Sequence, residues 1–184
     1  AERQSRTVPK SYKSAIVLIP PESVWEPIQK VRSLYDRKIG RWMPHVTLIY
    51  PFAPEERFTE LLPSVATACR RMTPFRVRLA TFRWFVHRGG SATIWLEPEP
   101  SERVAAIEAE LERELVGYDD QSRRFGRFTP HLSVGQVPAK DVQAVVNSLQ
   151  AEWEPTEFLL DRIALICRSD TGPFQVRFWS PLGN

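Results

Sequence analysis

A six-residue pattern occurs twice in this 184-residue chain, as Met-Pro-His-Val-Thr-Leu at 43–48 and as Thr-Pro-His-Leu-Ser-Val at 129–134. Each copy opens a similar succession of strand, helix and hairpin, over about residues 43–98 and 129–181. A duplicated unit of this kind commonly packs as two lobes about an approximate two-fold axis. We therefore expect one bilobal domain over residues 14–184, in which His45 and His131 face each other across the seam.

The hydrophobic pattern between and around the two copies is that of an α+β fold with antiparallel hairpins. The polar and basic residues 1–13 are expected to form a loose tail. Helical spacing of apolar residues predicts helices over 24–35, 58–72, 101–115 and 142–149. Strands are predicted at 15–19, 46–50, 75–86, 92–96, 132–137, 158–167 and 174–179.

Composition excludes several classes of protein. A net charge of +3 does not demand a polyanionic partner, although 20 of the 25 basic residues are arginine, which suits bidentate contact with phosphate. Cys69 and Cys167 are too few for a disulfide framework or a structural zinc site. The chain has no apolar run long enough to span a membrane and no signal-peptide pattern, so we expect a cytoplasmic protein without a membrane partner.

The repeated pattern places chemically useful groups on one face of each strand. Alternate residues of a strand share a face, so His45 and Thr47 point one way while their apolar neighbours point into the core. His131 and Ser133 do the same in the second copy. The two pairs together offer two imidazoles that exchange protons near neutral pH and two hydroxyls that donate hydrogen bonds to phosphate oxygens.

Other interpretations of these residues fit less well. A single histidine on a strand is most often a packing or surface residue, but two of the three histidines stand in the same setting. Two histidines without a carboxylate at ligand spacing fall short of a metal site, so no metal or cofactor is expected. Ser133 lacks the Gly-x-Ser-x-Gly context of a triad nucleophile, and Thr47 occupies its equivalent position.

The strings MPHVTLIYPF and TPHLSVGQ resemble the two His-x-Thr/Ser motifs of the 2H phosphoesterase superfamily, in particular its branch of 2′-5′ RNA ligases and RNA 2′,3′-cyclic phosphodiesterases. Motif order and element pattern extend the resemblance over roughly residues 14–181. It implies two pseudo-symmetric lobes, each with an antiparallel sheet and outer helices, around a central cleft that holds both motifs. It also implies metal-independent hydrolysis of a 2′,3′-cyclic phosphate to a 2′-phosphate by a monomer that acts on RNA 3′ ends or small nucleotides.

Two alternatives remain open at this point. One is cleavage of a linear 2′-5′ or 3′-5′ phosphodiester, or ligation in the reverse direction. The other is a non-catalytic module that binds RNA or a nucleotide.

The resemblance gives the four motif residues definite roles. One histidine takes a proton from water while the other protonates the departing ribose oxygen, and pKa values near ~6.5 would let them divide these roles. We favour His45 as the acid and His131 as the base, and the pseudo-symmetry of the two copies makes these roles exchangeable at this point. Thr47 and Ser133 would hold the non-bridging oxygens as charge develops on them.

One departure from the branch concerns its usual arginine three residues beyond the second hydroxyl, where Gln136 stands in this chain. The Gln136 amide can still donate hydrogen bonds to a bound substrate but carries no charge, so either the affinity for phosphate is lower or Arg127 or Arg168 supplies the missing charge. Further candidates for substrate binding are the aromatic residues Trp42 and Trp84, which can stack a base, and Tyr50, which is expected near the mouth of the cleft. The third histidine, His87, has no partner in the second copy and is expected at the surface.

Overall fold

The fold is built on eight antiparallel strands, seen in a computed structural model that describes residues 8–183 except for the side chain of Phe125. The strands are β1 (Ser14–Leu18), β2 (Val46–Ile49), β3 (Phe75–Val86), β4 (Ser91–Glu99), β5 (Leu132–Pro138), β6 (Thr156–Leu160), β7 (Arg162–Cys167) and β8 (Gln175–Pro181). They form one sheet in the order β6-β3-β4-β5-β2-β1-β7-β8. The α helices are α1 (Trp25–Tyr35), α2 (Phe58–Arg70), α3 (Ser101–Glu114), α4 (Asp120–Phe125) and α5 (Val142–Glu152), and the short 3₁₀ helices are η1 (Glu22–Val24), η2 (Glu55–Arg57) and η3 (Ala139–Asp141).

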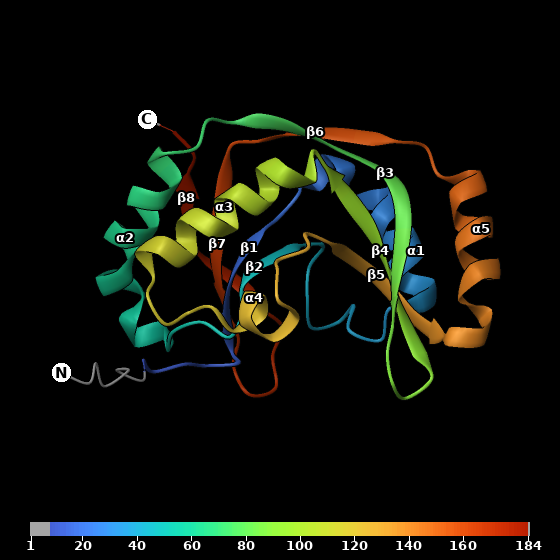
Figure 1. Cartoon of the computed structure of the whole chain (residues 1–184), viewed down its shortest axis with the longest axis horizontal. Helices are drawn as coiled ribbons and strands as arrows, with labels where there is room; N and C mark the ends of the chain where they lie inside the picture. Colours follow the sequence, from blue (N-terminus) through green and yellow to red (C-terminus); the bar gives the residue numbers. More distant parts are fainter. Residues whose placement is uncertain (1–7, 184) are drawn as a thin grey trace.

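The sheet divides into two halves at the strands that carry the repeated motif. Between β2 and β5 the register contains one residue pair, Val46 with Leu132, whereas the other strand pairs of the sheet share three to seven. We call β6-β3-β4-β5 the β5 half and β2-β1-β7-β8 the β2 half. Helix α2 lies against β8 at one end of the molecule and α5 against β3 at the other, as Figure 1 shows. The expected α+β fold with two sheet-and-helix lobes is confirmed.

The two repeats are exchanged between these halves. The β3–β4 hairpin belongs to the first copy but pairs with β5 of the second copy. The β7–β8 hairpin belongs to the second copy but pairs with β1, which leads to β2 of the first. Each half therefore combines the motif strand of one copy with a hairpin of the other.

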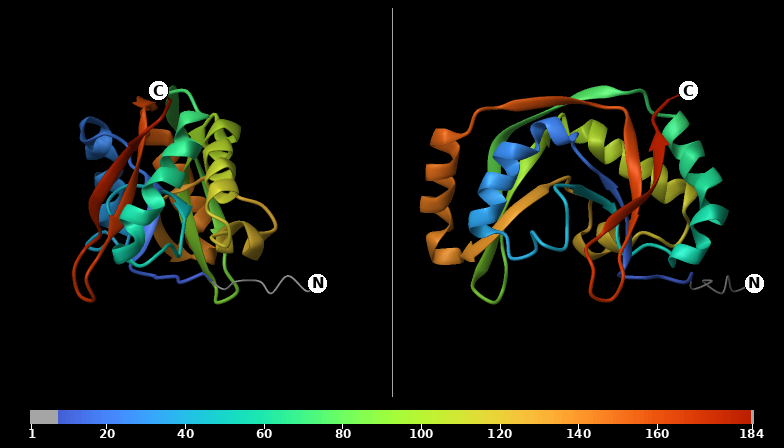
Figure 2. Two further views of the ribbon diagram at one scale, coloured as in Figure 1. Left: turned by 90° about the vertical axis from the view of Figure 1, so that its left-hand side faces the viewer. Right: turned by 180° about the vertical axis from the view of Figure 1, so that it is seen from behind.

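The apolar segment 158–167 is two strands, so the prediction of a single strand there is wrong. Exposed Asp161 separates β6, which pairs with β3, from β7, which pairs with β1 and β8. The segment crosses from the β5 half to the β2 half along one edge of the molecule, in orange in Figures 1 and 2. Both parts are apolar because both cover the core. The hydrophobic pattern of the sequence therefore does not show where the chain changes from one pairing strand to another.

The prediction of a loose tail is wrong for residues 8–13, whereas residues 1–7 lie outside the described part of the chain. Ser11 and Phe52 exchange two backbone hydrogen bonds, and the Lys10 ammonium pairs with the Asp120 carboxylate. Polar composition did not reveal these contacts because they join the segment to residues far along the chain, Phe52 after β2 and Asp120 in α4. That helix was not predicted from the sequence, since its six residues are too few to show a helical period.

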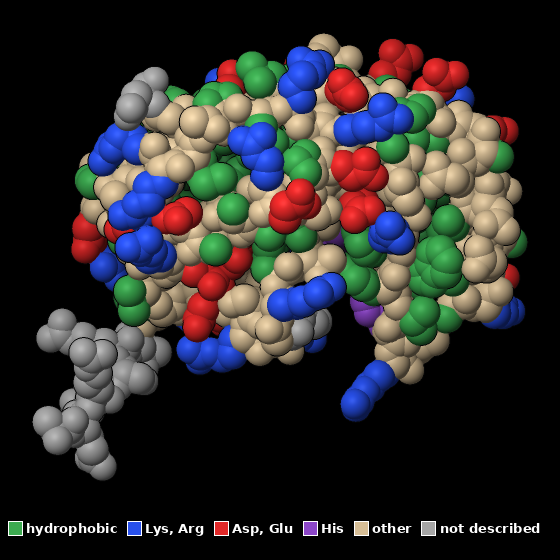
Figure 3. Space-filling model, turned by 45° about the horizontal axis from the view of Figure 1, so that its top comes forward, with side chains coloured by type: hydrophobic (Ala, Val, Ile, Leu, Met, Phe, Trp, Pro, Cys, Tyr) green, Lys and Arg blue, Asp and Glu red, His purple; other side chains and the backbone are tan. Residues whose placement is uncertain are grey.

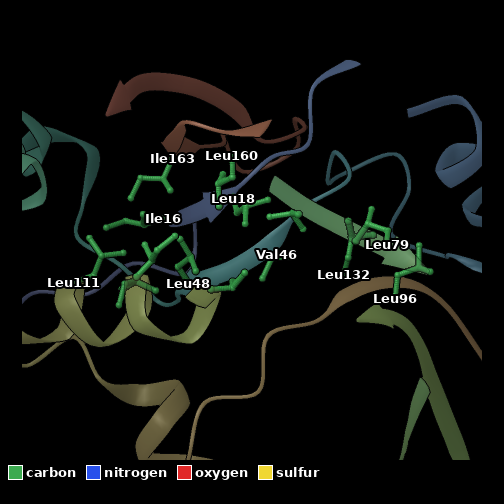
Figure 4. Close-up of a cluster of buried hydrophobic side chains, with 14 of the residues drawn as sticks. Ile16, Leu18, Val46, Leu48, Leu79, Leu96, Leu111, Leu132, Leu160 and Ile163 are labelled. Atoms are coloured by element: carbon green, nitrogen blue, oxygen red, sulfur yellow. The ribbon is translucent and has the colours of Figure 1, made fainter. Parts of the chain in front are cut away.

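A continuous apolar core runs beneath both halves and across the seam. Figure 4 shows side chains from β1, β2, β4, β5 and α3 meeting in one cluster. Val46, Leu48, Leu132 and Val134 are at most 1% exposed, which is worth roughly 1.5–3 kcal/mol for each fully buried side chain. A one-residue slip of either motif strand would move these groups into the cleft, so the core fixes which way the histidines point. Among residues 8–183 no helix is long and apolar enough to cross a membrane.

Candidate functional site

The four motif side chains meet at the seam of the sheet. Val46 lies opposite Leu132, so the antiparallel register places His45 opposite Ser133 and Thr47 opposite His131. All four are partly exposed, on the face opposite the core. Figure 3 shows the notch that opens between the two halves of the molecule. The structure thus brings together the two imidazoles and two hydroxyls that were singled out in the sequence.

Both imidazole rings are held in the same way. Nδ1 of His45 lies 2.7 Å from the carbonyl oxygen of Met43, and Nδ1 of His131 lies 2.8 Å from that of Thr129. A carbonyl only accepts, so Nδ1 carries the hydrogen in each ring and Nε2 is the nitrogen left for proton transfer. In both cases the acceptor stands two residues before the histidine, which makes this orientation a local property of the repeated motif.

Both imidazoles are less basic than an ordinary histidine. Burial lowers the pKa of His45 to about 4, helped by the charges of Arg32 and His131 and opposed by the Met43 hydrogen bond and by Asp36. Burial also lowers the pKa of His131, against the Thr129 hydrogen bond. The expectation of pKa values near the ordinary one is therefore wrong. Both rings are neutral at pH 7 in the unliganded protein, and a negative charge in the cleft would be needed to hold a proton on one of them.

Aromatic side chains flank each histidine. The Trp42 indole stacks on His45 with centroids 4.5 Å apart and planes at 16°. Phe85 and Trp95 meet His131 edge-on, at 5.1 and 5.8 Å. Sequence reasoning missed Phe85 and Trp95, because the pairing of β4 with β5, which sets Trp95 opposite Ser133, joins hairpin and motif strand of different copies.

Trp84 is not brought to the site. It pairs with Ile94, whose side chain is buried, and it packs against the main core. Its neighbour Phe85 lies on the cleft side instead, as the alternation of a strand requires. Trp84 was a candidate for stacking a base, but its side chain lies on the face of β3 that packs against the core.

A β-bulge recurs at the same place in both motif strands. In β2 the register with β1 skips Leu48, and in β5 the register with β4 skips Val134. A bulge adds one residue and thereby reverses the alternation beyond it. Residues five positions after each histidine, Tyr50 and Gln136, therefore return to the face of the histidines.

Gln136 has both ends of its amide engaged by the segment that follows α1. Its Nε2 donates to Asp36 Oδ1 at 3.2 Å, and its Oε1 accepts the backbone N–H of Arg37 at 3.1 Å. This approach requires Gly135, because a Cβ there would lie 2.3 Å from Cβ of Tyr35. Gln136 thus serves to hold residues 36–42, which lead into the first motif.

A buried ion pair holds the same segment from the other side. Arg32 is 2% exposed, and its Nε donates to Asp36 Oδ2 at 2.8 Å while an Nη donates to the carbonyl of Trp42 at 2.8 Å. Burial alone would raise the pKa of Asp36. Hydrogen bonds from Arg32, the Lys38 backbone and Gln136 outweigh burial and hold this pKa below its usual value. Arg32 therefore positions Trp42, which in turn stacks on His45.

The other sequence candidates lie at differing distances from the motifs. Tyr50 meets Trp42 edge-on at 5.5 Å, and Arg168 lines a small cavity with these two rings. Arg127 is exposed on the segment between α4 and β5. His87 is exposed near the β3–β4 turn, with Nε2 2.7 Å from Thr93 Oγ1, so its expected surface position is confirmed. Within the described residues, no group of three or more His, Cys, Asp or Glu side chains is arranged to hold a metal ion.

Comparison with known proteins agrees with this architecture. A family model described as the 2′-5′ RNA ligase superfamily matches residues 20–172. A Geobacillus kaustophilus protein named "Putative phosphoesterase" is 25% identical over 166 residues, which cover 89% of this chain and 92% of the relative. A Bacillus cereus protein of similar name is 24% identical over 173 residues, 93% of this chain and 97% of the relative.

Solved structures resemble the whole fold. E. coli LigT, solved in complex with phosphate, matches with a TM-score of 0.62 at 15% identity and covers 95% of this chain and 99% of its own. TT0787 of Thermus thermophilus matches with a TM-score of 0.60 at 21% identity and covers 93% and 98%. The arrangement of two sheet halves around a seam is therefore one that these proteins share.

Proposed function

The chain belongs to the 2′-5′ RNA ligase superfamily of 2H phosphoesterases, and from this premise we propose that it hydrolyses 2′,3′-cyclic phosphates at RNA 3′ ends or on small nucleotides. The observation that carries the proposal is the pair of imidazoles at the seam, each oriented by a carbonyl on Nδ1 and each beside a hydroxyl from the opposite strand. Two proton-transfer groups and two neutral hydrogen-bond donors are what in-line opening of a cyclic phosphodiester requires.

The proposed reaction uses the two Nε2 atoms on opposite sides of phosphorus. Neutral His131 accepts a proton from water as the water oxygen bonds to phosphorus. The bond from phosphorus to the ribose 3′ oxygen breaks, and protonated His45 gives its proton to that oxygen. The product is a 2′-phosphate, and the proton on His131 returns to solvent while His45 is protonated again. Thr47 and Ser133 donate hydrogen bonds to the non-bridging oxygens.

The depressed pKa values add a role for the substrate. Both histidines are neutral near pH 7 before substrate arrives. The negative charge of a phosphodiester raises the pKa of an imidazole beside it, so binding itself would recruit the proton that the acid needs. The acid is then charged mainly when a substrate is present.

The direct test is a substrate panel with purified protein and excess EDTA. We expect hydrolysis of adenosine 2′,3′-cyclic phosphate to the 2′-phosphate, with slower or no cleavage of 2′-5′- and 3′-5′-linked dinucleotides. If a linear linkage is cleaved faster, the substrate is a linear phosphodiester, and the acid–base reaction of the two histidines is retained. Tight binding of nucleotides with no product from any compound would instead support a non-catalytic binding module.

The pH dependence should show the shifted pKa values. In the free enzyme one histidine must be protonated and the other neutral, and both have pKa values below about 6.5, so the bell of kcat/KM should peak below about pH 6.5. The bell of kcat reports the complex, where the phosphate raises the pKa, so its peak should lie at higher pH. Rates between pH 4 and 8.5 check this. Coincident peaks above pH 7 would contradict it.

A further inference from the structure

Beside His45 lies a cavity of about 420 Å³ that the proposed hydrolysis does not use. It is lined by Arg37, Lys38, Arg41, Trp42, Tyr50, Arg168 and Phe174, and we call it the loop pocket. Trp42 forms its wall towards the seam, where the same indole stacks on His45 at 4.5 Å. The loop pocket and the first motif are thus separated by a single ring.

The charge of the loop pocket is positive, and no carboxylate lies in its lining. Four of its seven lining residues are cationic and none is acidic. In the part of the chain that the structure describes, none of these four cations forms an ion pair with a carboxylate. Arg168 donates to backbone carbonyls of Ser169 and Asp170, and its buried Nε has no hydrogen-bond partner. Such a concave cluster attracts an anion and offers several N–H donors to it.

The aromatic rings of the pocket are already engaged. The Trp42 centroid lies 4.5 Å from that of His45 and 3.8 Å from that of Phe174. Tyr50 meets Trp42 edge-on and donates its hydroxyl to the carbonyl of Tyr12 at 3.0 Å. Little indole surface is left on which a base could stack. The pocket therefore suits a phosphate group better than a nucleobase.

The backbone beneath the cations is fixed while their charged ends are exposed. The N–H of Arg37 donates to Gln136 and that of Lys38 to Asp36, at 3.1 and 2.9 Å. The N–H of Phe174 donates to the carbonyl of Arg41 at 2.8 Å. The side chains of Arg37, Lys38 and Arg41 remain exposed above this framework. A ligand phosphate would meet cations whose backbone positions are set in advance, so that only their exposed side chains become ordered on binding.

We propose that the loop pocket binds a second, uncleaved phosphate on the 5′ side of the ribose whose cyclic phosphate is opened. This inference rests on the proposed function and narrows its substrate. The pocket lies one indole away from His45, so the two phosphates belong to the same nucleotide. RNA 3′ ends and 5′-phosphorylated nucleoside 2′,3′-cyclic phosphates are then preferred over cyclic nucleotides with a free 5′-hydroxyl.

The test compares adenosine 2′,3′-cyclic phosphate with and without a 5′-phosphate. For the wild-type protein we expect kcat/KM to be about 10- to 100-fold higher with the 5′-phosphate, mainly through a lower KM, because three or four cation–phosphate contacts add up to this range. The preference should decrease as salt is raised. In the variant Arg37→Ser/Lys38→Ser/Arg41→Ser the ratio of the two kcat/KM values should fall close to one.

A matched control removes the same charge elsewhere. Lys30→Ser/Arg113→Ser/Lys140→Ser takes three exposed cations from α1, α3 and η3, and it should retain the wild-type ratio. Equal use of both substrates by the wild type, or an equal loss of preference in both triple variants, would overturn the inference and leave the proposed function standing. Hydrolysis of neither compound would overturn the proposed function itself.

Discussion

Alanine in place of either His45 or His131 is expected to lower kcat on a nucleoside 2′,3′-cyclic phosphate by ~10²–10⁴, the usual contribution of a positioned acid or base. Each ring is partly exposed and its one hydrogen bond is to a backbone carbonyl, so its loss removes proton transfer without exposing the core. Steady-state rates with unchanged far-ultraviolet circular dichroism check this. His87→Ala is the matched control, because His87 is exposed near the β3–β4 turn and should leave kcat unchanged. Normal turnover in both cleft variants would refute the assignment.

The same variants separate the acid from the base. A substrate with sulfur in place of the 3′ oxygen has a leaving group that needs no proton. The variant that lacks the acid should recover most of its rate on this substrate, whereas the variant that lacks the base should not. Recovery by His45→Ala supports the roles proposed above. Recovery by His131→Ala would exchange them.

Breaking the buried pair of Arg32 with Asp36 is expected to produce the largest loss of stability. In Arg32→Met the Asp36 carboxylate stays buried without its partner, and removal of one member of a buried pair costs about 3–5 kcal/mol of unfolding free energy. Urea denaturation at pH 7 measures this loss. Without Arg32 the pKa of Asp36 should be higher than in the wild type, because burial still raises it. The loss should shrink as the pH falls through this higher pKa, because protonation removes the unpaired charge.

Two further variants identify the cause. Arg32→Met/Asp36→Asn removes both charges, keeps Oδ1 as acceptor for the Lys38 N–H and Gln136, and should recover much of the lost stability. Arg57→Met breaks the Arg57–Glu60 pair, in which Glu60 is mostly exposed, and should cost less than about 1 kcal/mol. Equal losses from Arg32→Met and Arg57→Met would contradict the role of burial. No recovery in the double variant would show that packing, and not the unpaired charge, dominates.

The motif strands were predictable because one face of each must be buried. Apolar residues at 46, 48, 132 and 134 set the direction of the side chains between them, and this holds whatever the strands pair with. Pairing itself was not predictable. The hairpin that follows β2 in sequence could have joined either half, and the split at Asp161 follows from a change of partner that hydrophobicity does not record.

Within the site, spacing located the histidines and hydroxyls but not what surrounds them. Tyr50 and Gln136 reach the same face only because a bulge interrupts each strand, and a bulge has no clear signature in apolar residues. The pKa of His45 depends on burial and on Arg32, which stands 13 residues earlier and meets the site through tertiary folding. The loop pocket likewise collects residues from the segment after α1, the end of β2 and the β7–β8 connection, which only the folded chain brings together.

The exchange of hairpins between the halves also governs how the chain can be divided. A cut between the copies does not release two self-sufficient modules, because β5 would lose both of its neighbours, β2 and β4, and the β2–β1 pair would lose β5 and β7. Such fragments could complete their sheets only by complementing one another. The seam that brings the four motif side chains together therefore exists only in the intact chain, whose two similar halves depend on each other for their sheets.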